Sequence, residues 1–236
     1  MDRAPRSRID ASAFAPIRPG VLSTEVLEQI RERILDGSLP LGSRVRDSVL
    51  AEAMGVSRSP VREALRTLEQ RGLVRKSPNH SYEVVTFSER DIHEIALLRV
   101  AYETMAAREL IERRVELAPL RARLDDLVLR DDGKGSRSAV AGADGRFHTE
   151  LVRLTHLPRL IASYGALRDQ IDLLLANGFL TRGEFIATQR ERHEDLIEVV
   201  AAGAVSGNAE PSVIAIREHI LGGMLFTDDW HPPGVG

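Results

Sequence analysis

The stretch VLAEAMGVSRSPVREALRTLEQRGL, residues 49–73, contains two short helical patterns separated by a turn at Gly55. Apolar residues at helical spacing mark the second pattern: Val61, Leu65 and Leu68. Ser57 stands where the N-cap of the second helix is expected, and its hydroxyl can accept a hydrogen bond from a backbone N–H of the first turn. A short helix, a glycine turn and a capped second helix predict a helix-turn-helix, which inserts its second helix into a DNA groove.

Arginines recur every four residues along the second helix, at Arg58, Arg62 and Arg66, so they share one helix face. Each can fork onto O6 and N7 of guanine, and the Ser57 hydroxyl can bond a phosphate or a base edge. The alternative is that Arg62 and Arg66 only solvate this face or pair with Glu63 and Glu69 of the same helix. Arg46, which precedes the first helix, completes the DNA contacts predicted within this motif.

The composition narrows the classes of protein to which the chain can belong. Its 236 residues suffice for one large or two modest domains, and 43% hydrophobic with only 4% aromatic residues favours a core of aliphatic helices. No apolar run reaches the roughly 18 residues that a membrane span needs, and the N-terminus lacks the apolar segment of a secretory signal. Because the chain has no cysteine and hence no disulfide, we expect a cytoplasmic protein.

The net charge of −3 hides an asymmetry along the chain. Residues 1–86 hold 14 Lys and Arg against 11 Asp and Glu, whereas the remainder holds 18 against 24. The first part can therefore approach a polyanion, although the bias is mild and the prediction of DNA binding depends on the motif. Residues 1–19, with four arginines, three prolines and little periodicity, are predicted to form a flexible arm, or else to have no role.

Elements on both sides extend the helix-turn-helix into a winged form. A helix is predicted from about residue 23 to residue 35, and breaks rich in glycine and proline separate it from the motif. After Gly72, the segments LVRK and SYEVVTF flank a turn at residues 77–80, and their β-branched and aromatic residues favour a β-hairpin. We assign residues 20–87 to a winged helix-turn-helix domain.

From Ser88 the pattern is helical almost to the end of the chain. Ser88, followed by acidic residues that include Asp91, is typical of a capped helix start. Further helices are predicted over about 92–110, 117–129, 143–155, 158–176, 182–202 and 209–226, with loops at 131–142 and 203–208. The predicted fold class is therefore mainly α, with an all-helical domain over residues 88–228 and a tail over residues 229–236.

The order of these motifs resembles the GntR family of bacterial transcription regulators. VLEQIRERILDGSLPLGSRV and LAEAMGVSRSPVREALRTLEQRGLV follow that family's pattern closely. The helical remainder resembles the ligand-sensing FCD domain of the FadR subfamily. The resemblance implies a homodimer that binds double-stranded DNA at a short inverted repeat. It also places Ser57, Arg58 and Arg62 at positions that usually touch bases and phosphates.

The tip of the predicted hairpin departs from that family. The family usually has Pro-x-Arg-Gly there, whereas this chain has Pro78-Asn79-His80-Ser81. Serine replaces a glycine that tolerates positive φ, and histidine replaces the arginine. Asn79 and His80 remain predicted DNA contacts, because a protonated imidazole can still approach a phosphate. We expect this wing to read DNA differently from the wings of the family.

Asp144 and His148 are four residues apart in ADGRFHTEL and therefore share a helix face, while His193 and His219 lie in two later predicted helices. A carboxylate and three imidazoles from separate helices can build a metal site in a bundle, and they suit Zn, Ni, Co, Mn or Fe(II). A lone histidine is more often a surface or core residue. The FCD resemblance, however, implies one Asp and three His ligands at these positions. We predict a divalent metal ion, with zinc as the first choice.

The same resemblance implies a small organic acid that binds at the metal through its carboxylate. Arg99 matches a family arginine and is the predicted effector contact, and the alternative is an ion pair with Glu103 of the same helix. The family often has Gly-Asn-Pro after the Asp/His helix, whereas this chain has His156-Leu157-Pro158, so the family's effector specificity does not carry over. His93, His156 and His231 match no ligand position.

Three functions follow from these features. The first is a metal-containing repressor of transcription that responds to a small carboxylate. The second is a metal-dependent enzyme, a hydrolase or lyase, that uses the same residues. The chain has no HExxH motif, nucleophile elbow or phosphate loop, and an enzyme would leave the DNA-binding head unexplained. The third is a regulator that responds to an acyl-CoA, a type that lacks the full set of metal ligands. We predict the first function and no enzymatic activity.

Overall fold

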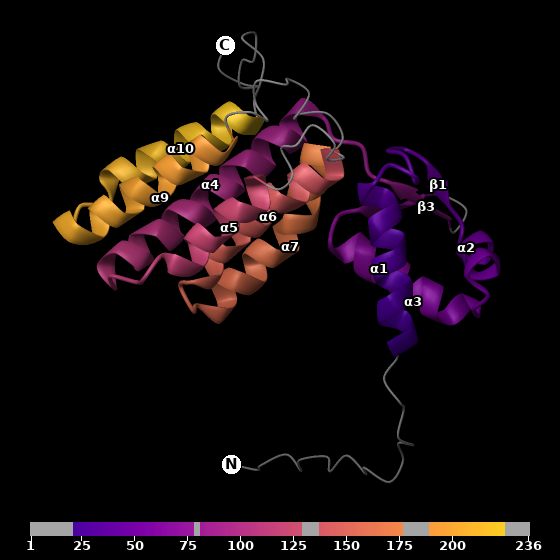
Figure 1. Ribbon diagram of the computed structural model, residues 1–236. Helices are drawn as coiled ribbons and strands as arrows, with labels where there is room; N and C mark the ends of the chain where they lie inside the picture. Colours follow the sequence, from indigo (N-terminus) through magenta and orange to yellow (C-terminus); the bar gives the residue numbers. More distant parts are fainter. Residues whose placement is uncertain (1–20, 78–80, 129–136, 177–188, 225–236) are drawn as a thin grey trace, which may run out of the picture.

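The computed structural model describes residues 21–77, 81–128, 137–176 and 189–224. In Figure 1 a small head of helices and strands lies beside an elongated bundle of helices. The predicted fold class, a winged helix-turn-helix followed by an all-helical bundle, is confirmed. Several predicted features lie outside the described residues: the arm 1–19, the wing tip with Asn79 and His80, residues 182–188 of one helix and the tail 229–236.

The head contains α1 (Val21–Leu35), β1 (Arg44–Val45), α2 (Asp47–Met54), α3 (Arg58–Gln70), β2 (Val74–Ser77) and β3 (Ser81–Val84). The strands form an antiparallel sheet in the order β1-β3-β2, with Val45 opposite Tyr82. The hairpin forms as predicted, but β1 was not predicted, because two residues are too few to show alternation. Apolar side chains from the helices and the sheet form one core: Val26, Ile30, Ile34, Ala51, Val61, Leu65, Leu68, Leu73 and Val84.

The turn between α2 and α3 depends on two residues. Gly55 ends α2 with a left-handed φ of 64°, which a glycine adopts without the steric cost of a Cβ. Ser57 takes the predicted N-cap position of α3 in extended backbone, but its hydroxyl makes no capping hydrogen bond. The exposed hydroxyl at the start of α3 is therefore not committed to stabilising that helix.

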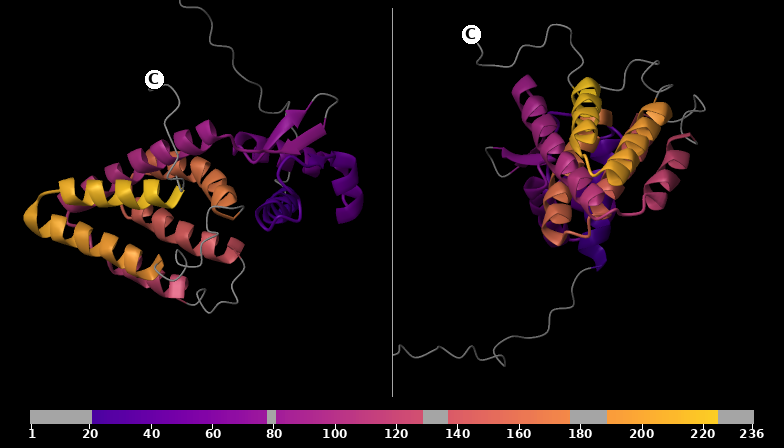
Figure 2. Two further views of the ribbon diagram at one scale, coloured as in Figure 1. Left: turned by 90° about the horizontal axis from the view of Figure 1, so that it is seen from above. Right: turned by 90° about the vertical axis from the view of Figure 1, so that its left-hand side faces the viewer.

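The bundle contains α4 (Glu89–Glu112), α5 (Ala118–Val128), α6 (Arg137–Arg153), α7 (Pro158–Leu174), α9 (Gln189–Ser206) and α10 (Glu210–Met224). A capping box starts α4: Ser88 Oγ accepts a hydrogen bond from the Asp91 amide, and the Asp91 carboxylate accepts one from the Ser88 amide. The end-on view in Figure 2 shows the helices grouped around a shared interior. Large aliphatic and aromatic side chains fill it: Leu110, Leu120, Phe147, Leu151, Tyr164, Ile171, Ile197 and Ile220.

Two helices extend past one of their predicted ends, because glycines at predicted loop positions lie inside them. Helix α6 begins at Arg137 instead of about residue 143, and α9 continues to Ser206 through most of the predicted loop 203–208. At Gly203 an added Cβ would lie 2.7 Å from Ile111 Cδ1. This glycine therefore permits close packing of α9 against α4 and does not end the helix.

Helix α7 connects the two cores. Its Leu173 is fully buried in the core of the head, whereas Tyr164 and Ile171 lie in the core of the bundle. Figures 1 and 2 both show α7 as the bundle helix beside α1, and residues of these two helices are in contact. The head is thus joined to the bundle through side chains as well as through the chain itself.

Candidate DNA-binding face and buried histidine centre

Helix α3 has one apolar face and one basic face. Its buried residues pack into the head core: Val61, Ala64, Leu65 and Leu68. Ser57, Arg58, Arg62 and Arg66 are exposed, and so is Arg46 immediately before α2. The predicted DNA contacts within the described residues therefore all lie at the surface of the helix-turn-helix.

Asp47, in the first turn of α2, holds two of these arginines. Its carboxylate accepts hydrogen bonds from Arg58 Nη2 at 2.9 and 3.0 Å and from Arg62 Nε at 2.5 Å. Glu63, one of the glutamates considered as a partner within α3, instead accepts a hydrogen bond from Ser23. Burial acts to raise the pKa of Asp47, but the hydrogen bonds from Arg62 and Arg58 outweigh it and lower this pKa. The two guanidinium groups are therefore oriented by an ionised carboxylate that sequence reasoning missed.

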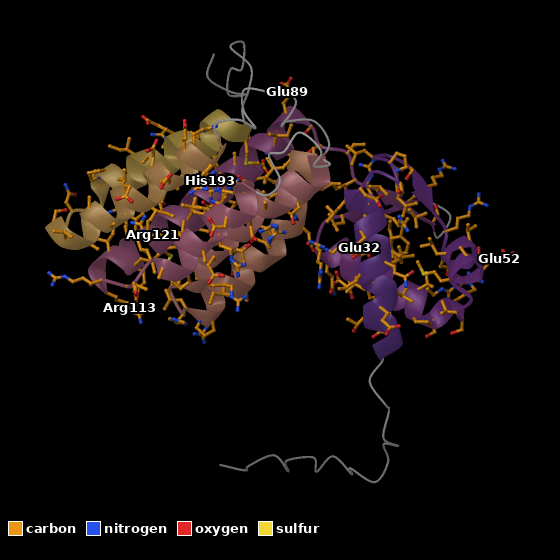
Figure 3. All side chains as sticks on the ribbon, viewed as in Figure 1. Glu32, Glu52, Glu89, Arg113, Arg121 and His193 are labelled. Atoms are coloured by element: carbon orange, nitrogen blue, oxygen red, sulfur yellow. The ribbon has the colours of Figure 1, made fainter. Side chains whose placement is uncertain are left out.

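Three imidazoles and one carboxylate meet inside the bundle. Asp144 and His148 come from α6, His193 from α9 and His219 from α10, and one donor atom of each lies within 4.8 Å of the others. His148 Nε2 lies 3.1 Å from His193 Nε2 and 3.2 Å from His219 Nε2. Asp144 Oδ1 lies 3.2 Å from His193 Nε2. Figure 3 shows His193 among the helices of the bundle, and His148 and His193 are fully buried.

The ionisation of His219 and Asp144 suits metal binding. Burial and Arg99 act to lower the pKa of His148, but Glu103 and Asp144 outweigh them and raise it, so a metal competes with a proton at that imidazole. Burial lowers the pKa of His219 well below its usual range, and the neighbouring His193 and His148 lower it further, so the imidazole is neutral. Burial acts to raise the pKa of Asp144, but His148 and Arg99 outweigh it and hold this pKa well below its usual range. A neutral imidazole and an ionised carboxylate are the forms of these side chains that bind metals.

The spacing of the donor atoms also fits a metal ion. Bonds of about 2.0–2.1 Å at tetrahedral angles place neighbouring donors about 3.3 Å apart. The separations here are 3.1 and 3.2 Å between imidazole nitrogens, and 3.2 and 3.7 Å from Asp144 Oδ1 to the nitrogens of His193 and His148. The residues present therefore fit a divalent ion of the size of zinc.

A second layer of polar side chains supports this centre. Glu103 of α4 is fully buried and accepts hydrogen bonds from His148 Nδ1 at 2.7 Å, from Arg99 Nε at 2.8 Å and from Tyr164 Oη at 2.9 Å. Burial acts to raise the pKa of Glu103, but His148 and Arg99 lower it to about 2. A carboxylate at Nδ1 fixes the orientation of the imidazole and leaves its Nε2 lone pair directed at the centre.

Arg99 links this second layer to the centre itself. It pairs with Glu103, as the alternative interpretation of the sequence held, and its Nη2 also lies 3.4 Å from Asp144 Oδ2. The sequence indicated Glu103 only as the partner of Arg99, and it gave no signal for Tyr164. A glutamate four residues after an arginine usually marks an exposed ion pair on a helix. A tyrosine with no motif around it is usually a core or surface residue. His93 and His156 lie outside the histidine centre, and His231 lies outside the described residues.

Comparison with known protein families accounts for both parts of the chain. The model of the bacterial regulatory proteins of the gntR family matches residues 22–84, and the model of the FCD domain matches residues 94–221. The chain belongs to the GntR family of bacterial regulatory proteins and carries an FCD domain. No helix among the residues described for this GntR-family protein is both long and apolar enough to cross a bilayer.

Relatives of this GntR-family protein are transcription regulators. It is 27% identical over 141 residues to the HTH-type transcriptional regulator YdhC of Bacillus subtilis. The matched segment covers 59% of this chain and 63% of YdhC. It is 29% identical over 185 residues, 76% of this chain and 80% of the other, to the Probable D-xylose utilization operon transcriptional repressor of Paenarthrobacter nicotinovorans. The structure of McbR/YncC of Escherichia coli shares its fold, with a TM-score of 0.69 at 23% identity over 88% of this chain and 97% of that one. The protein is a transcription regulator and not an enzyme.

Proposed function

We propose that this regulator represses transcription as a homodimer on a short inverted-repeat operator, and that a small carboxylate changes its operator affinity by binding at a metal-containing centre. The observation that carries the proposal is the buried group of Asp144, His148, His193 and His219, whose donor atoms lie within 4.8 Å of one another. The relative from Paenarthrobacter nicotinovorans is named as a repressor, which supports repression over activation.

Operator sequence is read mainly by the start of α3. Arg58 and Arg62 leave 56% and 62% of their side chains exposed, and Asp47 holds both in one orientation, which suits bidentate recognition of guanine. Contacts from the neighbouring polar and basic residues to phosphates add affinity without sequence information. The complete proposed set is Arg46, Ser57, Arg58, Arg62, Arg66, Asn79 and His80.

The proposed metal is zinc, with Ni, Mn, Co or Fe as alternatives for the same donors. A bound divalent ion supplies a Lewis-acid position that an effector carboxylate can occupy. Arg99 adds a permanent positive charge beside that position, which favours an anionic ligand. Among the described residues, its hydrogen bonds to Glu103 and Asp144 use two of its five N–H donors, so it can also contact the effector.

An exposed apolar surface on α4 supports the homodimer. Leu98 and Met105, two helical turns apart on one face, are 46% and 53% exposed, and Leu97 beside them is 48% exposed. A two-fold partner that covers this surface would give the pair of heads the symmetry of an inverted repeat. The proposed domains are residues 20–87 for DNA binding and 88–228 for sensing and dimerisation. The proposed location is the cytoplasm, where a regulator meets the chromosome.

Selection from random duplexes, followed by mobility-shift titration, tests the DNA-binding part of the proposal. Arg58→Ala should abolish specific binding while the dimer stays intact. The matched control is Arg108→Ala, since Arg108 is an exposed arginine that pairs with Glu210 in the bundle. Unchanged operator affinity in Arg58→Ala would remove α3 from the proposed interface.

Elemental analysis tests the metal part of the proposal. His148→Ala should lose bound metal and keep its basal DNA affinity, whereas the control His156→Asn should retain metal. A thermal-shift screen of the metal-loaded protein with small carboxylates then identifies the effector class, because a ligand stabilises the folded state by mass action. The same screen with acyl-CoA tests the alternative effector. One metal per chain in His148→Ala would contradict the proposed ligand set.

A further inference from the structure

Helix α7 contacts the head beyond Leu173 alone. Gln170 packs against Gly72, a residue with a left-handed φ of 71° between α3 and β2. An added Cβ at Gly72 would lie 2.6 Å from the Gln170 amide nitrogen, so a larger residue would displace the Gln170 side chain. Since Leu173 is itself part of the head core, a movement of α7 must either carry the head with it or open this contact.

Two buried carboxylates on α7 hold arginines of the head. Asp169 accepts hydrogen bonds from Arg31 Nε of α1 at 2.7 Å and from Arg71 Nη1, at the end of α3, at 3.2 Å. Asp172 accepts one from Arg31 Nη2 at 3.5 Å. The two aspartates are only 5% and 6% exposed, so the loss of an arginine partner would leave a buried negative charge uncompensated. The DNA-reading helix is thus tied to α7 by charge.

Arg168 ties this group to α6, the helix that carries two residues of the histidine centre. Its Nε donates to Asp172 Oδ1 at 2.7 Å, and its Nη1 donates to Thr149 Oγ1 at 2.5 Å. Its guanidinium lies directly over Gly145, where an added Cβ would be 2.0 Å from Cζ. Gly145 and Thr149 each directly follow a residue of the histidine centre in the sequence.

We propose that Arg168 is a positioning residue that transmits movement of α6 to the DNA-binding head through Asp172 and Arg31. This inference rests on the proposed sensing role of the histidine centre. When α6 shifts, Gly145 and Thr149 shift with it, and the guanidinium either follows them or loses Asp172. It has room to move, because it borders a cavity of about 470 Å³ that Arg31 and Asp172 also line. Glu32, another lining residue of this cavity, is labelled on α1 in Figure 3.

The chain itself offers a second route between the two parts. Residues 85–88 connect β3 to α4, and Phe87 packs against both cores. A test of Arg168 must therefore disturb the contact between α6 and Arg168 without touching this connection. Gly145→Ala meets this requirement. It adds only a methyl group, and this group displaces the guanidinium of Arg168.

A double-mutant cycle of Gly145→Ala and Arg168→Ala tests this proposal. The measured quantity is the rate of amide hydrogen exchange in α1 and at the end of α3, the two parts of the head that Asp169 and Asp172 contact. Each single variant should accelerate exchange there about tenfold, as expected for the loss of one charged hydrogen bond. The double variant should exchange no faster than Arg168→Ala, because no guanidinium remains to be displaced. Unchanged head exchange in Gly145→Ala, or a Gly145→Ala effect of undiminished size in the Arg168→Ala background, would overturn the proposal.

Two further variants keep this cycle decisive. Gly165→Ala is the matched control, because it adds the same methyl group to α7 at a position where no other described residue lies within 4 Å beyond the adjacent helix backbone, and head exchange should stay at the wild-type rate. Thr149→Val removes the Oγ1 acceptor of Arg168 with almost no change in volume. If Gly145→Ala disturbs α6 itself, Thr149→Val takes its place in the double-mutant cycle with Arg168→Ala. An additive result for Thr149→Val with Arg168→Ala would likewise overturn the proposal.

Zinc alone, added to the metal-free protein, separates this proposal from the proposed function. In wild type, Zn²⁺ should slow exchange in α6, α9 and α10 and also change it in α1, whereas in Arg168→Ala the change should stay within the bundle. An equal response of α1 in both proteins overturns the role of Arg168. No response in the bundle of the wild type contradicts the metal site, while the double-mutant cycle still decides the role of Arg168.

Discussion

Replacing Glu103 with glutamine should show how the histidine centre is organised. Glutamine keeps the volume of the side chain, and its carbonyl oxygen can still accept hydrogen bonds from Arg99 and Tyr164. Its amide N–H group then faces His148 Nδ1, which lies 2.7 Å from the carboxylate in the wild type. The imidazole must accept at Nδ1 and carry its proton on Nε2, where that proton occupies the lone pair needed for a metal.

The expected size of this effect follows from the role of the carboxylate. Loss of a hydrogen-bonding partner of a metal-binding histidine typically weakens metal affinity about 10–100-fold, which corresponds to about 1.4–2.8 kcal/mol. Leaving a buried charge without any partner costs about 3–5 kcal/mol, but Arg99 keeps Asp144 Oδ2 at 3.4 Å, so the loss of stability should be smaller. We therefore expect a folded protein with lower thermal stability and zinc affinity reduced about 10–100-fold.

Competition of the protein with a chromophoric chelator for Zn²⁺ measures this affinity, and circular dichroism verifies the fold. The matched control is Glu109→Gln on the same helix, because its carboxylate pairs with Arg113 at 3.5 Å, away from the centre. This control should bind zinc as the wild type does. Wild-type zinc affinity in a folded Glu103→Gln protein would refute the conclusion that Glu103 directs the Nε2 lone pair of His148 toward a metal.

Three other substitutions test local features of the structure. Asp47→Asn removes the charge that holds Arg58 and Arg62 in one orientation, so specific DNA binding should weaken more than nonspecific binding. The ratio of the nonspecific to the specific dissociation constant, measured by fluorescence anisotropy, should fall about tenfold. An unchanged ratio would contradict the orienting role of Asp47. Asp91→Ala removes the capping box of α4 and should lower the free energy of unfolding in urea by about 1 kcal/mol at pH 7. Because hydrogen bonds from Ser88 lower the pKa of Asp91 below its ordinary value of 3.8, this difference should persist above about pH 4 and vanish as the pH falls through the lowered pKa; a difference that stays constant would refute it. His156→Gly relieves a left-handed φ of 53° and should raise the free energy of unfolding by about 0.5–1 kcal/mol, whereas a lower denaturation midpoint would count against strain there.

Local patterns in the sequence were sufficient to predict the helix-turn-helix and the helical bundle. The turn at Gly55 and the N-cap position of Ser57 follow from preferences of a few adjacent residues, which tertiary contacts did not override. The prediction was wrong where a glycine served packing instead of termination. Gly203 lies inside α9 because Ile111 of a distant helix occupies the space of its missing side chain, and no neighbour in the sequence reveals that.

In the candidate site, too, residues paired by local spacing could be predicted, and residues paired only by the fold could not. Asp144 and His148 could be paired from their spacing, because both lie on one helix, and the family resemblance added His193 and His219. Their supporting partners could not be found from spacing, because Glu103 and His148 are 45 residues apart, and Arg31 and Asp169 are 138 residues apart. Such contacts depend on which helix faces pack together.

By itself, the sequence determined the local elements, the caps and turns that bound them, and the types of donor atom available for DNA and metal. Only the tertiary structure decided that Asp47 orients Arg58 and Arg62, that Glu103 orients His148, and that α7 belongs to both cores. The physical reason is that periodicity and capping act within a few residues of chain. The free energy of a buried ion pair instead depends on burial and on charges that the fold brings together from far apart in the sequence.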